Sequence, residues 1–151
     1  MKNKFMRNIF KFSIIFYVIF SLFTNALSSE EFFKKGFELY KDKKYEDAKF
    51  MFERSIVFNP KDANSYLYLA KIYNHQEDQN KEEKNLDTTL LIEPDNEDAM
   101  LMLMKIGLEK SNYSKVKDLS KKFTEVCKKL CNENKKILDS LANIEPKNNE
   151  S

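Results

Sequence analysis

Two cysteines, Cys127 and Cys131, are the residues whose type and spacing could do chemistry most directly. Thiols four positions apart can join in a disulfide, remain free, or serve a redox or metal-binding role. A CxxxC pattern without a nearby histidine is a weak catalytic signal, and two sulfur atoms alone do not complete a zinc site. The choice between these chemistries depends on the compartment, because disulfides persist in oxidising surroundings.

His75 is the only histidine in the chain, with Glu77 and Asp78 close behind it. An imidazole beside carboxylates could act as a general base, but an exposed histidine at the end of a helix is the simpler interpretation. The sequence contains no Ser-His-Asp arrangement, no metal-ligand cluster and, with two glycines in all, no glycine-rich phosphate loop. We therefore expect no catalytic residue, no metal site and no cofactor.

The compartment is indicated by residues 1–28, which carry four basic residues and no acidic one. Their basic start leads into the apolar run FSIIFYVIFSLF and then into the small residues TNALSS, which is the order of a secretory signal peptide. The small residues predict cleavage after Ser28, with a second candidate cut after Ala26. The alternative is an uncleaved anchor, since the uncharged stretch at 12–29 has 18 residues, just enough to span a bilayer.

In both cases the positive-inside rule sends everything after residue 30 across the membrane. A composition rich in Lys, Asn, Ile and Phe behind a simple leader suits a bacterial periplasmic protein. We therefore expect a periplasmic or secreted chain, or one that is anchored in the membrane and faces the periplasm. In that oxidising space an even cysteine count favours one intramolecular disulfide between Cys127 and Cys131.

The net charge argues against one class of partner, nucleic acid. The whole chain has 26 basic and 24 acidic residues, and removing the four basic residues of the leader leaves 22 against 24, a net charge of −2. Residues 77–98 alone hold nine acids against two lysines. This balance argues against a protein that wraps nucleic acid. With 2 glycines and 3 prolines, the composition also disfavours a turn-rich all-β fold.

The rest of the chain repeats itself every 34 residues, which is the distance from Pro60 to Pro94. Alignment on these prolines matches large, small and hydroxyl-bearing residues in turn, and a third copy starts near Glu97. The matched pairs are Phe32 and Tyr66, Gly36 and Ala70, Phe52 and Leu86, Ser55 and Thr89, Ile56 and Leu90, and Phe58 and Ile92.

This pattern resembles the tetratricopeptide repeat (TPR) family over about residues 29–130, most specifically in the stretch KKYEDAKFMFERSIVFNP. Residues at the family's spacings are Phe32, Gly36, Tyr45, Ala48, Phe52, Ser55 and Pro60 in the first copy, and Tyr66, Leu69, Ala70, Tyr73, Leu86, Thr89 and Pro94 in the second. Gln79 and Glu82 depart from the family's Tyr and Ala, which predicts poorer packing of that helix. The third copy keeps Tyr113 but has Val116 for Ala and no closing proline.

The resemblance implies an all-α fold: an α-solenoid of about three helix-turn-helix repeats with a C-terminal capping helix, preceded by a signal-peptide helix. The expected units are the signal peptide or signal anchor at 1–28, repeats at 29–61, 62–95 and 96–130, the capping helix at 131–145 and a disordered tail at 146–151. The expected helices are 30–42, 45–58, 63–75, 79–92, 97–110, 113–127 and 133–144.

Local signals agree with this phase of the repeat. Residues that can cap a helix start stand where helices should begin: Ser28 in a capping box with Glu31, then Asp62, Asp78, Asn96 and Asn112. In the last helix, the stripe expected to face the third repeat is Ile137, Leu138, Leu141 and Ile144. The repeat phase ends a helix near Cys127 and starts one near Asn132, so the cysteines would bracket a tight turn.

The resemblance also implies a binding surface, because the first helices of TPR repeats line a concave face. The expected groove residues are Phe33, Phe37, Tyr40, Lys41, Asn64, Leu67, Lys71, Asn74, Leu101, Lys105 and Leu108. Apolar contacts would supply affinity, and the lysines would select an acidic or C-terminal carboxylate group. In so short an array, part of this row could instead pack internally. The family's carboxylate-clamp specificity is not supported, since it needs Lys and Asn where Phe33 and Phe37 stand.

We therefore expect a non-catalytic module: an exported TPR scaffold that binds a protein or peptide segment through this groove, within a bacterial cell-envelope assembly. Two alternatives stay open, namely a thiol-disulfide redox accessory that uses Cys127 and Cys131, and a membrane-anchored version of the same module. Nucleic acid is not expected as a partner, and membrane contact is expected only through an uncleaved N-terminal segment. The sequence does not indicate the partner's identity or the oligomeric state.

Overall fold

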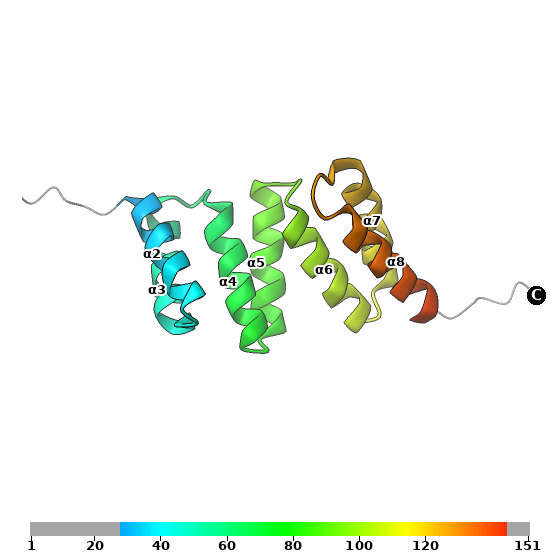
Figure 1. Cartoon of the computed structure of the whole chain (residues 1–151), viewed down its shortest axis with the longest axis horizontal. Coiled ribbons are helices and arrows are strands. Elements are labelled where there is room, and N and C mark those ends of the chain that lie inside the picture. The colour runs from blue at the N-terminus through cyan, green and yellow to red at the C-terminus, as the bar shows by residue number, and fades with distance from the viewer. Residues whose placement is uncertain (1–27, 145–151) are drawn as a thin grey trace, which may run out of the picture.

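The computed structural model describes residues 28–144, and these form an elongated row of helices (Figure 1). The expected leader and disordered tail lie outside these residues. The helices are α2 (Ser29–Lys41), α3 (Tyr45–Phe58), α4 (Ala63–His75), α5 (Gln79–Ile92), α6 (Glu97–Glu109), α7 (Tyr113–Val126) and α8 (Cys131–Ile144). Their bounds differ from the expected ones by at most two residues. Between residues 28 and 144, no helix is both long and apolar enough to cross a membrane.

Each helix packs mainly on its neighbours in the chain, most closely within the pairs α2–α3, α4–α5 and α6–α7, and α8 also contacts α6. The pairs α2–α3, α4–α5 and α6–α7 therefore stack along one axis, with α2 at one end and α8 at the other (Figure 1). This stacking buries the apolar face that each pair alone would leave exposed. The prediction of an all-α repeat solenoid is confirmed for the described residues.

Side-chain caps account for where the helices begin. The Ser28 hydroxyl accepts a hydrogen bond from the Glu31 N–H at 3.2 Å, and the Ser28 N–H donates to the Glu31 carboxylate at 2.8 Å, so the capping box is confirmed. The other predicted caps each accept a bond from the N–H three residues on: Asp62, Asp78, Asn96 and Asn112. These bonds satisfy amides that the first helical turn leaves without an internal partner.

The turn inside each helix pair contains one residue in the left-handed backbone region. These residues are Lys43, Glu77 and Ser111, with φ of 61°, 58° and 54°, and they recur every 34 residues. A side chain at this conformation crowds its own backbone, a penalty that glycine escapes. Each helix pair thus has a strained turn position at which the sequence has a residue other than glycine.

Replacing Glu77 with glycine should therefore raise the free energy of unfolding, by roughly 0.5 kcal/mol once glycine's greater chain entropy is subtracted. The matched control is Lys84→Gly in the middle of α5, where the same change should cost about 1 kcal/mol. Midpoints of urea unfolding for the two variants measure this difference. Equal losses in both would show that no strain is relieved at position 77.

The core forms three clusters along the array: two join successive helix pairs, and the third joins the α6–α7 pair to α8. The clusters are Ala48, Phe52, Leu69 and Ile72; Leu67, Ala70, Leu86, Ala99, Leu103 and Ile106; and Met100, Leu101, Met104, Val116, Phe123, Ile137 and Leu141. At two glycines, Gly36 and Gly107, the helices of one pair approach so closely that an added Cβ would displace its neighbours. A Cβ on Gly36 would lie 2.9 Å from Phe52 Cε1 and 3.2 Å from Met51 Cβ.

The capping helix α8 differs from the prediction in its start and in its buried face. It begins at Cys131, two residues early, and it buries Ile137 and Leu141, whereas Leu138 and Ile144 are 42 % and 52 % exposed. The predicted four-residue stripe was therefore wrong for Leu138 and Ile144. α8 contacts α7 and α6 along one narrow face, and the remaining place on that face is taken by a polar residue, the buried Asn134.

Asn134 is buried without loss of hydrogen bonds. The Ser120 hydroxyl donates to its side-chain oxygen at 2.8 Å, and its amide nitrogen donates to the Thr124 hydroxyl oxygen at 3.0 Å. A paired polar group in the interior costs little and fixes the register of the two helices. This network therefore sets where α8 lies along α7.

Candidate functional site

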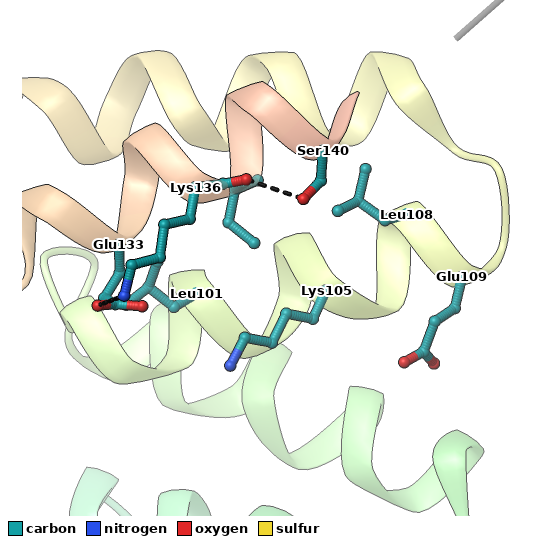
Figure 2. Close-up of a pocket in the computed structure, with 8 residues that line it drawn as sticks. Leu101, Lys105, Leu108, Glu109, Glu133, Lys136 and Ser140 are labelled. Carbon is teal, nitrogen blue, oxygen red and sulfur yellow. Dashed lines mark hydrogen bonds and ion pairs between the residues drawn. The ribbon is translucent and has the colours of Figure 1, made fainter. Parts of the chain in front are cut away.

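A pocket of about 390 Å³ lies between α6 and α8 at the C-terminal end of the array (Figure 2). Its lining is Leu101, Lys105, Leu108 and Glu109 from α6, and Glu133, Lys136, Ile137 and Ser140 from α8. The three groove residues predicted in the third repeat, Leu101, Lys105 and Leu108, thus share one pocket. Their spacing of three and four residues places them on one side of α6.

The pocket combines an apolar floor with charges at its rim. Leu101, Leu108 and Ile137 supply the apolar surface, and the Lys136 ammonium pairs with the Glu133 carboxylate at 2.6 Å (Figure 2). Lys105 is exposed, and within residues 28–144 its ammonium has no ion pair or hydrogen bond. The pocket can therefore bury a large aliphatic side chain and offer a free cation to an anionic group beside it.

At the other end of the array, the predicted residues Phe33, Phe37 and Tyr40 gather around Tyr68. The centroid of the Tyr68 ring lies 5.9, 5.3 and 5.1 Å from those of the three rings, with edge-to-face geometry. We call these four residues the aromatic cluster. Tyr68 was not predicted, because it lies one position past the expected row on α4.

Two predicted lysines lie over the aromatic cluster. The Lys41 ammonium is 5.0 Å from the centroid of Phe37, and the Lys71 ammonium is 5.0 Å from that of Tyr68. Such cations hold positive charge against an apolar surface. Burial raises the pKa of the Tyr40 and Tyr68 phenols, so both stay neutral at physiological pH.

The predicted residues of the second repeat do not all face solvent. Asn64 is exposed, but Leu67 is only 4 % exposed and packs in the core with Ala70, Leu86 and Leu103. Leu67 was therefore wrongly expected in the groove, because α4 turns that side chain towards α5 and α6. Lys71 lies 3.6 Å from the Asp98 carboxylate.

Asn74, the last groove residue predicted in the second repeat, hydrogen-bonds to a buried carboxylate, that of Glu82. Its amide donates to both oxygens of Glu82, at 3.1 and 3.2 Å, and Glu82 is only 4 % exposed. The equivalent positions in the other repeats hold Ala48 and Val116, both fully buried. Burial raises the pKa of the Glu82 carboxyl, and the Asn74 amide offsets part of that rise.

The predicted turn at residues 127–131, here the cysteine turn, joins α7 to α8. The sulfur atoms of Cys127 and Cys131 are paired and their Cα atoms lie 5.4 Å apart, within the span that a disulfide bridges. Glu97 at the start of α6 accepts bonds from the N–H groups between the cysteines: from Leu130 at 2.7 Å, Lys128 at 2.9 Å and Lys129 at 3.1 Å. These hydrogen bonds lower the pKa of the Glu97 carboxyl below its usual value, and the bond from the Leu130 N–H has the largest effect.

His75 is exposed, as expected, and stacks on Tyr45 with ring centroids 4.6 Å apart. Its Nε2 lies 3.3 Å from the Tyr45 hydroxyl. This contact joins the first helix pair, at the start of α3, to the second pair, at the end of α4. In the part of the chain that the structure describes, no group of three or more His, Cys, Asp or Glu side chains could hold a metal ion.

Comparisons with known proteins bear on the repeat. A family model described as a tetratricopeptide repeat matches residues 51–84, which is one full period. The sequence matches no curated protein. Identities of 15–17 % to solved structures show a shared fold alone.

Three of these similar structures are TPR domains or chaperones. The Sgt2 TPR domain from Aspergillus fumigatus has a TM-score of 0.63 at 15 % identity, over 76 % of this chain and 77 % of that one. The Yersinia enterocolitica type III secretion chaperone SycD, in complex with a peptide of the translocator YopD, has a TM-score of 0.66 at 15 % identity, over 76 % and 90 %. The first TPR of Spaghetti (RPAP3), bound to the HSP90 peptide SRMEEVD, has a TM-score of 0.65 at 16 % identity, over 78 % of this chain and 96 % of that one.

Proposed function

We propose that this chain, a tetratricopeptide-repeat protein, is an exported, non-catalytic module that binds a segment of a partner protein in the pocket between α6 and α8. Two of the similar structures, the Yersinia chaperone and the Spaghetti domain, are complexes with peptides, which supports this class of partner. The observation that carries the proposal is Lys105 beside an apolar floor, with no ion pair or hydrogen bond to any of residues 28–144.

The chemistry of the pocket indicates what it would bind. Leu101, Leu108 and Ile137 favour a large aliphatic side chain, whose burial would supply affinity. Lys105 favours a carboxylate beside that side chain, either an acidic residue or the end of a chain. The aromatic cluster, with Lys41 and Lys71 over its rings, would receive a more distant part of the same segment.

The leader supports export, and in the bacterial cell envelope the paired Cys127 and Cys131 would form a structural disulfide. A leader that stays uncleaved would hold the same module at the membrane. In this proposal the cysteines have no turnover chemistry of their own, and they serve to attach α8, which is one wall of the pocket.

The proposal is tested by placing the photo-crosslinker p-benzoylphenylalanine at Ser140, an exposed residue of the pocket lining, and irradiating cells that produce the protein. A discrete adduct with a partner protein is expected. Lys105→Glu should reduce its yield about tenfold, because a cation that pairs with the partner becomes a repelling anion.

The matched control is Lys84→Glu, the same charge reversal at an exposed lysine of α5 outside this pocket. It should leave the adduct yield unchanged. An adduct that survives Lys105→Glu, or that falls equally in both variants, would show that the pocket is not the binding site.

A further inference from the structure

The pocket exists only while two helices keep their relative position. One wall is α6, with Leu101, Lys105 and Leu108, and the other is α8, with Lys136 and Ile137 among its lining residues. The apolar floor is shared, since Leu101 and Ile137 belong to one core cluster. A shift of α8 away from α6 would therefore split the floor and open the pocket to water.

The cysteine turn, which leads into α8, is attached to the start of α6 chiefly through the Glu97 side chain, with Leu130 packed on the core cluster and Lys128 3.9 Å from the Asp95 carboxylate. Glu97 lies four residues before Leu101, on the same side of α6, and its carboxylate receives the N–H groups of residues 128–130. Successive backbone N–H groups that converge on one anion require a tightly curved chain. Glu97 therefore binds mainly the curved backbone of the cysteine turn, and the charge of Lys128 adds a smaller attraction.

That curvature is enclosed by the two cysteines. Cys127 closes α7, its N–H donating to the Phe123 carbonyl at 2.8 Å, and Cys131 is the first residue of α8. The three residues that bind Glu97 are the three between them. A covalent link between the two sulfurs thus holds the chain in the conformation that Glu97 binds.

We propose that the oxidation state of Cys127 and Cys131 regulates the pocket. With the bond formed, the cysteine turn stays on Glu97 and α8 completes the pocket; with both thiols free, the turn relaxes, Glu97 loses its donors and the α8 wall moves away. This regulation rests on the proposed function, because it controls the same binding site.

The chemical step is thiol-disulfide exchange with a dithiol reductant. A thiolate of the reductant attacks one sulfur, and that of Cys131 is the accessible one, since Cys131 is exposed and Cys127 is half-buried. The second thiolate then resolves the mixed disulfide. Two electrons and two protons pass to the pair, which becomes two thiols, and the reductant becomes a disulfide.

The rest of α8 would stay attached when the turn relaxes. Ile137 and Leu141 keep their packing on α7 while Ile137 separates from Leu101 of α6, and Asn134 keeps its bonds to Ser120 and Thr124. The change is therefore a loosening of one wall, and the array itself remains folded. Loss of a link that closes a five-residue loop predicts roughly a 30-fold increase in opening.

Hydrogen exchange of the mature protein, followed by mass spectrometry, measures this opening. Exchange of the α8 amides should rise roughly 30-fold when dithiothreitol reduces the pair, and amides of α4 should not change. Reoxidation should restore the slow exchange. The double variant Cys127→Ser with Cys131→Ser should exchange like the reduced protein.

Glu97→Gln tests the attachment without touching the sulfurs. It should speed α8 exchange several-fold in the oxidised protein, because an amide offers one acceptor oxygen and no charge to the three donors. The matched control is Asp98→Asn, the next acid in the first turn of α6, whose carboxylate lies 3.6 Å from the Lys71 ammonium and accepts none of the N–H groups of residues 128–130. It should leave α8 exchange unchanged.

The crosslink from Ser140 completes the test, and reduction should lower its yield at least fivefold. If α8 exchange is the same in both oxidation states, the regulation is wrong whatever the crosslink shows. If exchange rises but the adduct persists, α8 moves without controlling binding, which also overturns it. If the oxidised protein gives no adduct at all, the proposed function fails first and the regulation fails with it.

Discussion

Replacing Phe52 with alanine should lower the free energy of unfolding of the first two repeats by about 3–5 kcal/mol. The Phe52 side chain is fully buried, and its ring lies 5.7 Å from that of Phe33 and 5.4 Å from that of Tyr68. It also fills the space that Gly36 leaves open. Its neighbours belong to two helix pairs, so they cannot close the cavity without separating the repeats.

The loss should remain local, because each helix packs mainly on its chain neighbours. Hydrogen exchange should show lost protection in α2 and α3, whereas α7 and α8 keep theirs. The control is Phe50→Ala on the same helix, where the ring is 50 % exposed and the cost should be below about 1 kcal/mol. If Phe50→Ala costs as much, or if α7 and α8 lose protection too, the array does not behave as stacked units.

Replacing Glu82 with glutamine should stabilise the protein at pH 7, by about 1–2 kcal/mol. The carboxylate is buried at a position where the other repeats hold Ala48 and Val116, and glutamine keeps its shape and a bond to Asn74. The pKa of Glu82 is raised in the folded state, so folding is penalised wherever the carboxyl is ionised. That penalty develops as pH rises from the usual value of 4.5 through the raised one, and it is absent below both.

The gain from Glu82→Gln should therefore vanish as the pH falls towards 4. The neighbouring Glu83 is the matched control, and its pKa shifts in the opposite direction. The Lys110 ammonium, and to a smaller extent that of Lys115, lowers the pKa of the Glu83 carboxyl. Glu83→Gln should lose stability at pH 7, and the loss should disappear as the pH falls through the lowered pKa. Urea unfolding at pH 7 and pH 4 measures Glu82→Gln, and for Glu83→Gln the series continues below pH 4, because its folded-state pKa lies below the usual 4.5. A Glu82→Gln protein less stable than the parent at pH 7 would contradict the burial argument.

The repeat could be predicted from the sequence because its signals are local. A 34-residue period sets the phase, and caps such as Asp62 and Asn96 act on amides three residues away. Helix bounds follow from these short-range effects. The same phase brought Leu101, Lys105 and Leu108 to one face of one helix, and they share the pocket.

Features that depend on lateral contacts between helices were not predictable in the same way. The period indicates that Leu67 belongs to the first helix of a repeat, but not that α5 and α6 cover it. Nor does it indicate that Asn74 can satisfy a buried Glu82. The partners of Glu97 lie more than 30 residues further along the chain, and they are backbone groups, which carry no sequence signal.

The wrong prediction for α8, at the end of the array, has a similar explanation. Sequence periodicity made Leu138 and Ile144 candidates for the buried stripe of α8, yet among the helices of residues 28–144 it is mainly α6 and α7 that cover α8. A terminal helix in a solenoid has a neighbour on one side only. Its periodicity therefore overstates how much of it is buried.

The capping box at Ser28 lies at the cleavage point that the sequence predicts for the leader. Cleavage after Ser28 would remove both the hydroxyl and the N–H that bond with Glu31, and would leave a charged amino group on Ser29, at the positive end of α2. Loss of such a cap costs about 1 kcal/mol. Cleavage after Ala26 would keep Ser28 and its capping box. The two candidate cleavage sites differ by two residues, and the choice between them would decide whether helix α2 of the first repeat keeps its cap.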